Sequence, residues 1–206
     1  MKIHPILFTT PMVEAILDKT KTQTRRLVKP FFDDSLHLCR DGKAEYGEGT
    51  IVECPFGSIG DILWVRETFC LTQPKDPETY YFGYKCGVNT HSDYPASEKY
   101  DYSIPDVWKP SIHMPKEACR IFLQITGLRV ERLHDISAND AKSEGIKFVS
   151  DVDGWECYKR KDPTYPISPR ASFFYLFMSI YGMIKWEENP WVWVIEFKRV
   201  EKPQNF

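Results

Sequence analysis

The segment 61–69, DILWVRETF, constrains the fold most strongly, because mainly apolar residues alternate along it with a set that includes Arg66. An extended strand sends successive side chains to opposite faces, so Trp64 and Arg66 share one face and Glu67 falls among apolar residues on the other. A carboxylate in such a position needs either a proton or a cationic partner. We therefore expect a barrel strand in which Glu67 pairs with a cation and holds the basic run at residues 19–29 in place.

Several other segments have clear strand or helix character. The expected strands are residues 3–8, 121–130 and 191–199, and the expected helices are residues 10–18, 137–145 and 168–182. The sequence has no internal repeat and no regular alternation of strand, helix and parallel strand. This order predicts an α+β fold, in the form of a small mixed β-barrel with short flanking helices.

The first expected helix carries its start signal in the sequence. Thr10 is placed to cap it, and Pro11 occupies the first helical position, where no backbone N–H is needed. Met12, Ala15 and Ile16 recur at helical spacing, so they are the expected buried face.

The second expected helix has a capping signal and a clear end. Ser137 opens it with Asp140 three residues on, and Gly145 ends it. Glu144 therefore stands at the C-terminal end of the helix. Considered alone, a carboxylate at such a position is equally consistent with an exposed surface residue.

Composition limits the class of protein. The 206 residues carry a net charge of −2, so a role with nucleic acid would depend on a local patch. The N-terminal segment has neither the pattern of a signal peptide nor that of a transmembrane helix, so we expect a cytoplasmic protein without membrane contact. Six cysteines without a CxxC pair are expected to be reduced thiols.

Residues 1–206 are expected to form one domain with an insertion at about residues 72–118. That segment is rich in proline, glycine and tyrosine and has no clean periodicity. We interpret it as a lid or flap beside the main core.

The run at residues 19–29 is the strongest chemical signal in the chain. It holds five cations and no acid: Lys19, Lys21, Arg25, Arg26 and Lys29. Thr20, Thr22 and Thr24 are interleaved with these cations, so an extended segment would present both hydroxyls and cations to an anionic or polar ligand. The alternative is a basic loop that simply faces water.

Four motifs in order resemble the ASCH domain of the PUA-like superfamily. They are K-T-x-T-x-R at residues 21–26, G-D-x-L at 60–63, D-A-x-x-E-G at 140–145 and W-V-I-E-F at 193–197. The segments CPFGSIGDILWVRETF, WKPSIHMP and RVERLHDIS are similar to a version of this domain common in bacteriophages and prophages.

The resemblance implies a PUA-like barrel whose cleft binds RNA or nucleobases. Some bacterial members hydrolyse the acetyl amide of N4-acetylcytidine with a lysine, a threonine and a glutamate. Matched motif by motif, these residues are Lys21, Thr24 and Glu144, and Arg26 is the arginine of the motif. The small amidohydrolases lack counterparts of residues 72–118 and 146–168.

Amide hydrolysis needs a nucleophile, a proton acceptor and a group that stabilises the oxyanion. We expect Lys19, Arg25 and Arg26 to lower the pKa of Lys21, whose neutral amine would then deprotonate Thr24 or a water while Glu144 shuttles the proton. The remaining candidates are assigned to substrate binding: Thr22, Arg25, Arg26, Trp64, Arg66 and Glu67.

Two other functions use the same cleft. In the first, the chain is a binding module that recognises RNA or a modified base, with Arg25, Arg26, Lys29 and Arg66 contacting phosphates. The second is a ribonuclease, although the usual paired histidines are not evident. The expected partner is a modified nucleoside or RNA, and no metal and no cofactor are expected, since His37, Cys39 and Cys54 are loosely spaced for zinc.

Overall fold

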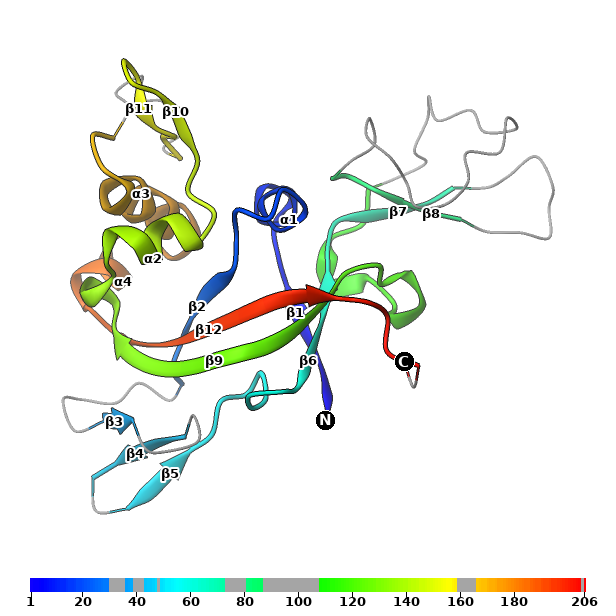
Figure 1. Cartoon of the computed structure of the whole chain (residues 1–206), viewed down its shortest axis with the longest axis horizontal. Coiled ribbons are helices and arrows are strands. Elements are labelled where there is room, and N and C mark those ends of the chain that lie inside the picture. The colour runs from blue at the N-terminus through cyan, green and yellow to red at the C-terminus, as the bar shows by residue number, and fades with distance from the viewer. Residues whose placement is uncertain are drawn as a thin grey trace.

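The computed structural model describes residues 1–29, 36–38, 43–47, 49–72, 81–86, 108–158, 166–204 and 206. Its centre is a five-stranded sheet with the strand order β1-β6-β9-β12-β2 (Figure 1). The strands are β1 (Ile3–Leu7), β2 (Gln23–Leu27), β6 (Ile62–Arg66), β9 (Phe122–Arg132) and β12 (Trp191–Val200). β1 and β6 are parallel, and the other neighbours in this sheet are antiparallel.

The predicted α+β class is confirmed, because a mostly β core carries a few short helices. The edge strands β1 and β2 approach each other, since Arg26 Nη2 donates to the carbonyl oxygen of Leu7 at 2.8 Å. Within the described residues, however, no backbone ladder joins these two edges, and the sheet is open. A closed barrel is therefore not confirmed.

Three smaller sheets surround the central one (Figure 1). They contain β3 (Leu36–Leu38), β4 (Ala44–Tyr46) and β5 (Thr50–Val52), then β7 (Phe69–Thr72) and β8 (Tyr81–Tyr84), and finally β10 (Phe148–Ser150) and β11 (Gly154–Trp155). The predicted insertion at residues 72–118 includes β8 and the turns after residue 108. Its segments 73–80 and 87–107 lie outside the described residues, and so does most of the expected lid.

Helix α1 (Thr10–Leu17) lies where the sequence predicts it, but its buried face is different. Thr9 rather than Thr10 is the N-cap residue, and Val13 and Ile16 are the buried side chains. The cause is a small rotation of the helix relative to the expected face, which leaves Met12 and Ala15 only half-buried.

Helix α2 (Ala138–Ser143) has the predicted capping box, in which Ser137 and Asp140 exchange hydrogen bonds at 3.0 and 3.2 Å. Glu144 is its C-cap residue. The helix α3 (Pro169–Tyr181) begins at the predicted residue. A further short helix, α4 (Met183–Glu187), was not expected and follows Gly182 directly.

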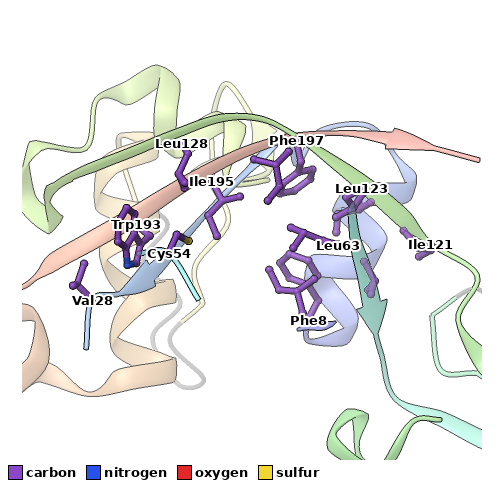
Figure 2. Packing of buried hydrophobic residues seen from close by; sticks show 14 of the residues in the cluster. Phe8, Val28, Cys54, Leu63, Ile121, Leu123, Leu128, Trp193, Ile195 and Phe197 are labelled. Carbon is purple, nitrogen blue, oxygen red and sulfur yellow. The ribbon is translucent and has the colours of Figure 1, made fainter. Parts of the chain in front are cut away.

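Both faces of strand β12 are covered, because its side chains alternate between two clusters. Trp193, Ile195 and Phe197 belong to the cluster shared with α1, whereas Val192 and Val194 pack against the helices after β9. Figure 2 shows the first cluster beneath the sheet, with Phe8 and Phe197 directed toward each other (ring centroids 6.3 Å apart). The two clusters fix the sheet between α1 on one side and α2, α3 and α4 on the other.

None of the helices in the described ranges is both long enough and apolar enough to pass through a membrane.

Candidate active site

The basic run is not a solvated loop. Lys21, Thr24 and Arg25 are 2%, 1% and 5% exposed, because the run enters the central sheet as β2. Lys19 has a φ of +61°, which turns the chain sharply between α1 and this strand. Three of the polar side chains that the sequence places in a loop are thus buried in the protein.

Lys21 and Glu144 form a buried ion pair. The Nζ atom of Lys21 lies 2.7 Å from Oε2 of Glu144, and the two side chains are 0% and 4% exposed. The same Nζ donates to the carbonyl oxygen of Glu144 at 2.8 Å, and the two backbones form an isolated β-bridge. The prediction that Glu144 is an exposed helix-end residue, which the sequence left as an alternative, is therefore wrong.

Gly145 allows the end of α2 to approach α1 this closely. Its φ is +88°, and a Cβ atom placed there would lie 2.8 Å from Cβ of Ala15 and 3.0 Å from Cβ of Lys21. Any other residue would be strained by the backbone conformation and would also collide with these two neighbours.

Arg25 holds the second oxygen of the Glu144 carboxylate. Its Nη1 donates to Oε1 of Glu144 at 3.1 Å, while Nε and Nη2 donate to Oε1 of Glu131 at 3.1 and 2.5 Å. Asp140 lies 3.7 Å from the same guanidinium. Because Arg25 is buried and is surrounded by three carboxylates, it occupies a structural position and does not face a ligand.

A second arginine extends this network. Arg129 donates to Oε2 of Glu131 and to Oδ1 of Asp140, at 2.9 and 2.8 Å, and also to Glu196. Gln23 donates to the backbone and the side chain of Asp140 at 3.0 and 3.1 Å. Both ends of α2 are thereby attached to strands β2 and β9.

Burial is the main cause of the altered pKa of Lys21. It lowers the pKa from the ordinary value of 10.5, the carboxylate of Glu144 opposes this effect, and the charges of Arg26 and Arg25 add smaller decreases. The predicted direction agrees with this result, but the predicted cause, a surrounding group of cations, is secondary. Lys19 is not among the largest contributions to this shift in the pKa of Lys21.

Thr24 and Arg26 lie on the face of β2 opposite Arg25, because successive strand residues alternate. The guanidinium of Arg26 is 5.0 Å from the centroid of the Phe8 ring, and Nζ of Lys21 is 5.8 Å from it. Thr22, in contrast, is exposed. The structure thus places Lys21 and Arg26 beside Phe8 and pairs Lys21 with Glu144, while Thr24 is buried on the strand that carries Arg26.

Trp64, Arg66 and Glu67 belong to a different part of the molecule. Arg66 lies over the Trp64 ring at 5.4 Å, on the predicted common face. Glu67 is 1% exposed and has the predicted cationic partner, which is Arg120, with two bonds of 2.9 Å. The expectation that Glu67 supports the basic run is not met by this pairing.

Sequence reasoning missed Glu131 and Arg129. Both lie in LRVERL, where charged residues alternate with the apolar Leu128 and Val130 on a strand. A charged pair on one face of a strand whose other face is apolar was a usable signal for a buried or half-buried ion network.

A cleft of about 730 Å³ opens beside Glu144. Its described lining residues come from α1, from α3 and from the segment between them: Thr9, Pro11, Met12, Ala15, Glu144, Gly145, Tyr158, Tyr175, Leu176, Met178, Ser179 and Ile180. Glu144 is the one charged side chain in this set. The cleft is therefore an apolar and aromatic pocket with a single carboxylate in its wall.

The other candidates lie away from this cleft or outside the described residues. His113 is an exposed residue of the 3-10 helix Ser111–His113. Cys39, one of the loose zinc candidates, is not described, and the described residues contain no group of three potential ligands. Five cysteines of the described ranges are not in disulfide bonds: Cys54, Cys70, Cys86, Cys119 and Cys157.

The arrangement offers a buried amine and a carboxylate that two cations hold, and this carboxylate lines an apolar cleft. Such a set can transfer a proton between an amine and a carboxylate without help from bulk water. Comparison of the chain with family models, with curated proteins and with solved structures found no match.

Proposed function

We propose that the protein is an amidohydrolase of the ASCH type, on a PUA-like barrel, that removes an acyl group from N4-acylated cytidine or a related modified base. The observation that carries the proposal is the ion pair of Lys21 and Glu144, which is buried and opens onto an apolar cleft. Ionisable pairs with perturbed pKa values concentrate at functional sites. The order of motifs that resembles the ASCH domain supports the same assignment.

Lys21 is the proposed base. Its lowered pKa favours a neutral amine, which takes a proton from the attacking Thr24 hydroxyl or from a water as the oxygen bonds to the acyl carbon. The C–N bond then breaks, and the departing exocyclic nitrogen receives a proton through Glu144. If Thr24 attacks, a water hydrolyses the resulting ester and restores the hydroxyl.

Arg25 and Arg26 have different roles in this proposal. Arg25 keeps one oxygen of Glu144 fixed through its 3.1 Å bond, and Glu131 keeps Arg25 in place. Arg26, or backbone N–H groups, stabilises the oxyanion, because its guanidinium lies beside Phe8 on the face of β2 that carries Thr24.

The lining of the cleft suits a base and its acyl group better than a phosphate. Tyr158 and Tyr175 provide aromatic surfaces for a base, and Met12 and Met178 provide apolar contacts for the acyl group. No cation is among the described lining residues, so a phosphate would have no counter-charge there. The proposed ligand is thus a modified nucleoside, or one modified base of an RNA, in the cytoplasm.

The test follows release of acetate and cytidine from N4-acetylcytidine by chromatography. Wild-type protein is compared with Lys21→Met, Glu144→Gln and Thr24→Val, and Lys29→Met is the matched control because Lys29 is an exposed cation of the same run. We expect turnover in the wild type and in the control, and its loss in the two variants of the ion pair. Absence of turnover in the wild type, across a series of N4-acyl groups, would reject the proposal.

A further inference from the structure

Two hydroxyl groups in the wall of the apolar cleft already use their protons within the protein. Tyr158 donates its proton to the carboxylate of Glu156 and accepts a hydrogen bond from the backbone N–H of Lys147. Ser179 donates its proton to the carbonyl oxygen of Leu176 at 2.7 Å. Neither hydroxyl group has a second proton to give, although each oxygen can still accept a hydrogen bond from a ligand.

The carboxylate of Glu144 in the same wall is also an acceptor. Nζ of Lys21 donates to Oε2 at 2.7 Å, and Nη1 of Arg25 donates to Oε1 at 3.1 Å. An ionised carboxylate has about four acceptor positions, so about two remain after these bonds. Glu144 can therefore accept a further hydrogen bond, for which the ligand has to supply the donor.

The ring of Tyr158 is fixed in this wall. Burial raises the pKa of its hydroxyl and the charge of Glu156 raises it further, so the side chain stays an uncharged phenol. Glu156 is itself fixed: its N–H donates to the carbonyl oxygen of Lys147 at 2.9 Å, and its carbonyl oxygen accepts from Oγ of the fully buried Ser172 at 2.5 Å. Because the hydroxyl is bonded to Glu156 and Lys147, Tyr158 offers a ligand mainly its aromatic ring.

These features favour one chemical class of ligand. A flat ring gains more from contact with an aromatic side chain than the buried area alone provides. An N–H donated to a carboxylate forms a stronger hydrogen bond than one between two neutral groups. We infer that the apolar cleft selects a secondary amide on a flat ring, with the ring against Tyr158 and the amide N–H donated to Glu144. Tertiary amides and esters lack this N–H and should be poor ligands.

This inference rests on the proposed function, because it assumes that the acylated base occupies the apolar cleft. It also narrows that function, since an N4-acylated cytosine is a secondary amide with one hydrogen on its exocyclic nitrogen. The hydrogen bond to Glu144 places this nitrogen beside the carboxylate through which it is protonated when the C–N bond breaks.

The test compares two isomeric nucleosides on the wild-type protein. N4-propionylcytidine has the amide N–H, whereas N4-acetyl-N4-methylcytidine has the same atomic composition without it. Kd is measured by stopped-flow quenching of the intrinsic fluorescence, before hydrolysis occurs, and release of the acid is then followed by chromatography. We expect the tertiary amide to bind about 10- to 100-fold more weakly, because it loses one hydrogen bond to a charged group.

Tyr158→Leu tests the contribution of the ring. It should weaken binding of both isomers by the same factor, about 3- to 10-fold, because the ring contact does not involve the amide N–H. Tyr158→Phe keeps the ring and should lose less affinity than Tyr158→Leu. The matched control is Asp151→Ala, which removes an exposed acid from the turn between β10 and β11 and should bind both isomers as the wild type does.

The possible results separate this inference from the proposed activity. Equal Kd values of the two isomers on the wild type would overturn the inference, even if both compounds are hydrolysed and the amidohydrolase stands. Tighter binding of N4-propionylcytidine without any hydrolysis would reject the activity and retain the inference. Failure to bind either isomer, or unchanged binding by Tyr158→Leu, would also overturn it. The comparison of isomers uses the wild type alone, so it does not depend on the folding of any variant.

Discussion

Lys21 and Glu144, which are 123 residues apart in the sequence, are joined both through their side chains at 2.7 Å and through a backbone β-bridge. The start of β2 and the end of α2 therefore cannot separate without exposing a buried ion pair. This contact also connects the basic run with Glu144, whose carboxylate lines the apolar cleft. Both the local fold and the proposed hydrolysis therefore depend on the pair of Lys21 and Glu144.

Breaking this pair from one side should destabilise the protein strongly. Glu144→Gln leaves the buried charge of Lys21 without a carboxylate, and the expected loss in the free energy of unfolding is about 3–5 kcal/mol. The loss for Lys21→Met should be smaller, because Glu144 keeps Arg25 as a second cationic partner at 3.1 Å. The double variant should be more stable than the sum of the two losses predicts, by about 1–3 kcal/mol. Urea denaturation of the four proteins measures this difference, and strictly additive losses would contradict it.

Lys21 should also set the pH dependence of hydrolysis. Because burial lowers its pKa from 10.5, the neutral amine becomes available at a lower pH than in a free lysine. We expect kcat/KM for N4-acetylcytidine to rise with pH with a midpoint below pH 10.5. A midpoint at pH 10.5 or above would show that Lys21 is not the base.

Gly145→Ala should damage the site through the backbone. The added Cβ meets Ala15 and Lys21 at 2.8 and 3.0 Å, so we expect a loss of about 1–3 kcal/mol and a displaced Glu144. Gly60→Ala is the control, since its φ of +92° is similar but nothing lies within 4 Å of the new atom. The two variants share the backbone strain, so the difference between their losses in unfolding free energy, measured by thermal unfolding, reports the steric contact of the new Cβ atom. Equal losses would show that the contact with Ala15 and Lys21 has no effect.

Asp140 should make the protein sensitive to acid. Burial raises its pKa, but hydrogen bonds from Ser137 and Gln23 and the charge of Arg25 outweigh this effect and lower it from 3.8 to about 2. Between these values the unfolded chain binds more protons than the folded chain, so the free energy of unfolding decreases as the pH falls through this window.

The expected decrease due to Asp140 is about 1 kcal/mol at pH 3 relative to neutral pH. Asp140→Asn should remove this part of the pH dependence, and Asp135→Asn, which alters an exposed acid nearby, should not. Urea unfolding at several pH values provides the measurement. A variant with the wild-type acid profile would show that the carboxylate is not stabilised in the folded state.

Strands of the central sheet and the start of helix α2 could be predicted from the sequence, because the patterns that indicate them involve only neighbouring residues. The alternation around Trp64, the apolar strand that begins at Trp191 and the capping pair of Ser137 and Asp140 each depend on a few neighbouring residues. The face of α1 was predicted in part: Ile16 is buried as expected, but Val13 and not Ala15 is buried beside it, because the packing partner of the helix lies on distant strands.

The candidate site was only partly predictable, since burial depends on contacts between distant segments. The run of cations suggested a segment that presents charges to a ligand or, as the alternative, to water, and nothing near Lys21 in the sequence indicates that Glu144 would neutralise it. The cationic partner of Glu67 was expected, but its identity as Arg120 depends on how β9 approaches β6. The alternation around Glu131 indicated an ion network, but its partner Arg25 lies 106 residues away and could not be identified from the strand alone.

Helix α2 has six residues, which is too short for a helix to persist in isolation. Side chains of β2 and β9 hold both of its ends, so it acquires its shape only after those strands have assembled with β12. The carboxylate of Glu144 is therefore among the last groups to reach its native position during folding. The amide hydrogens of Ala141 and Glu144, which are bonded within this turn, should lose protection from exchange when the contacts with β2 and β9 are lost, and an intermediate without that sheet would have no site.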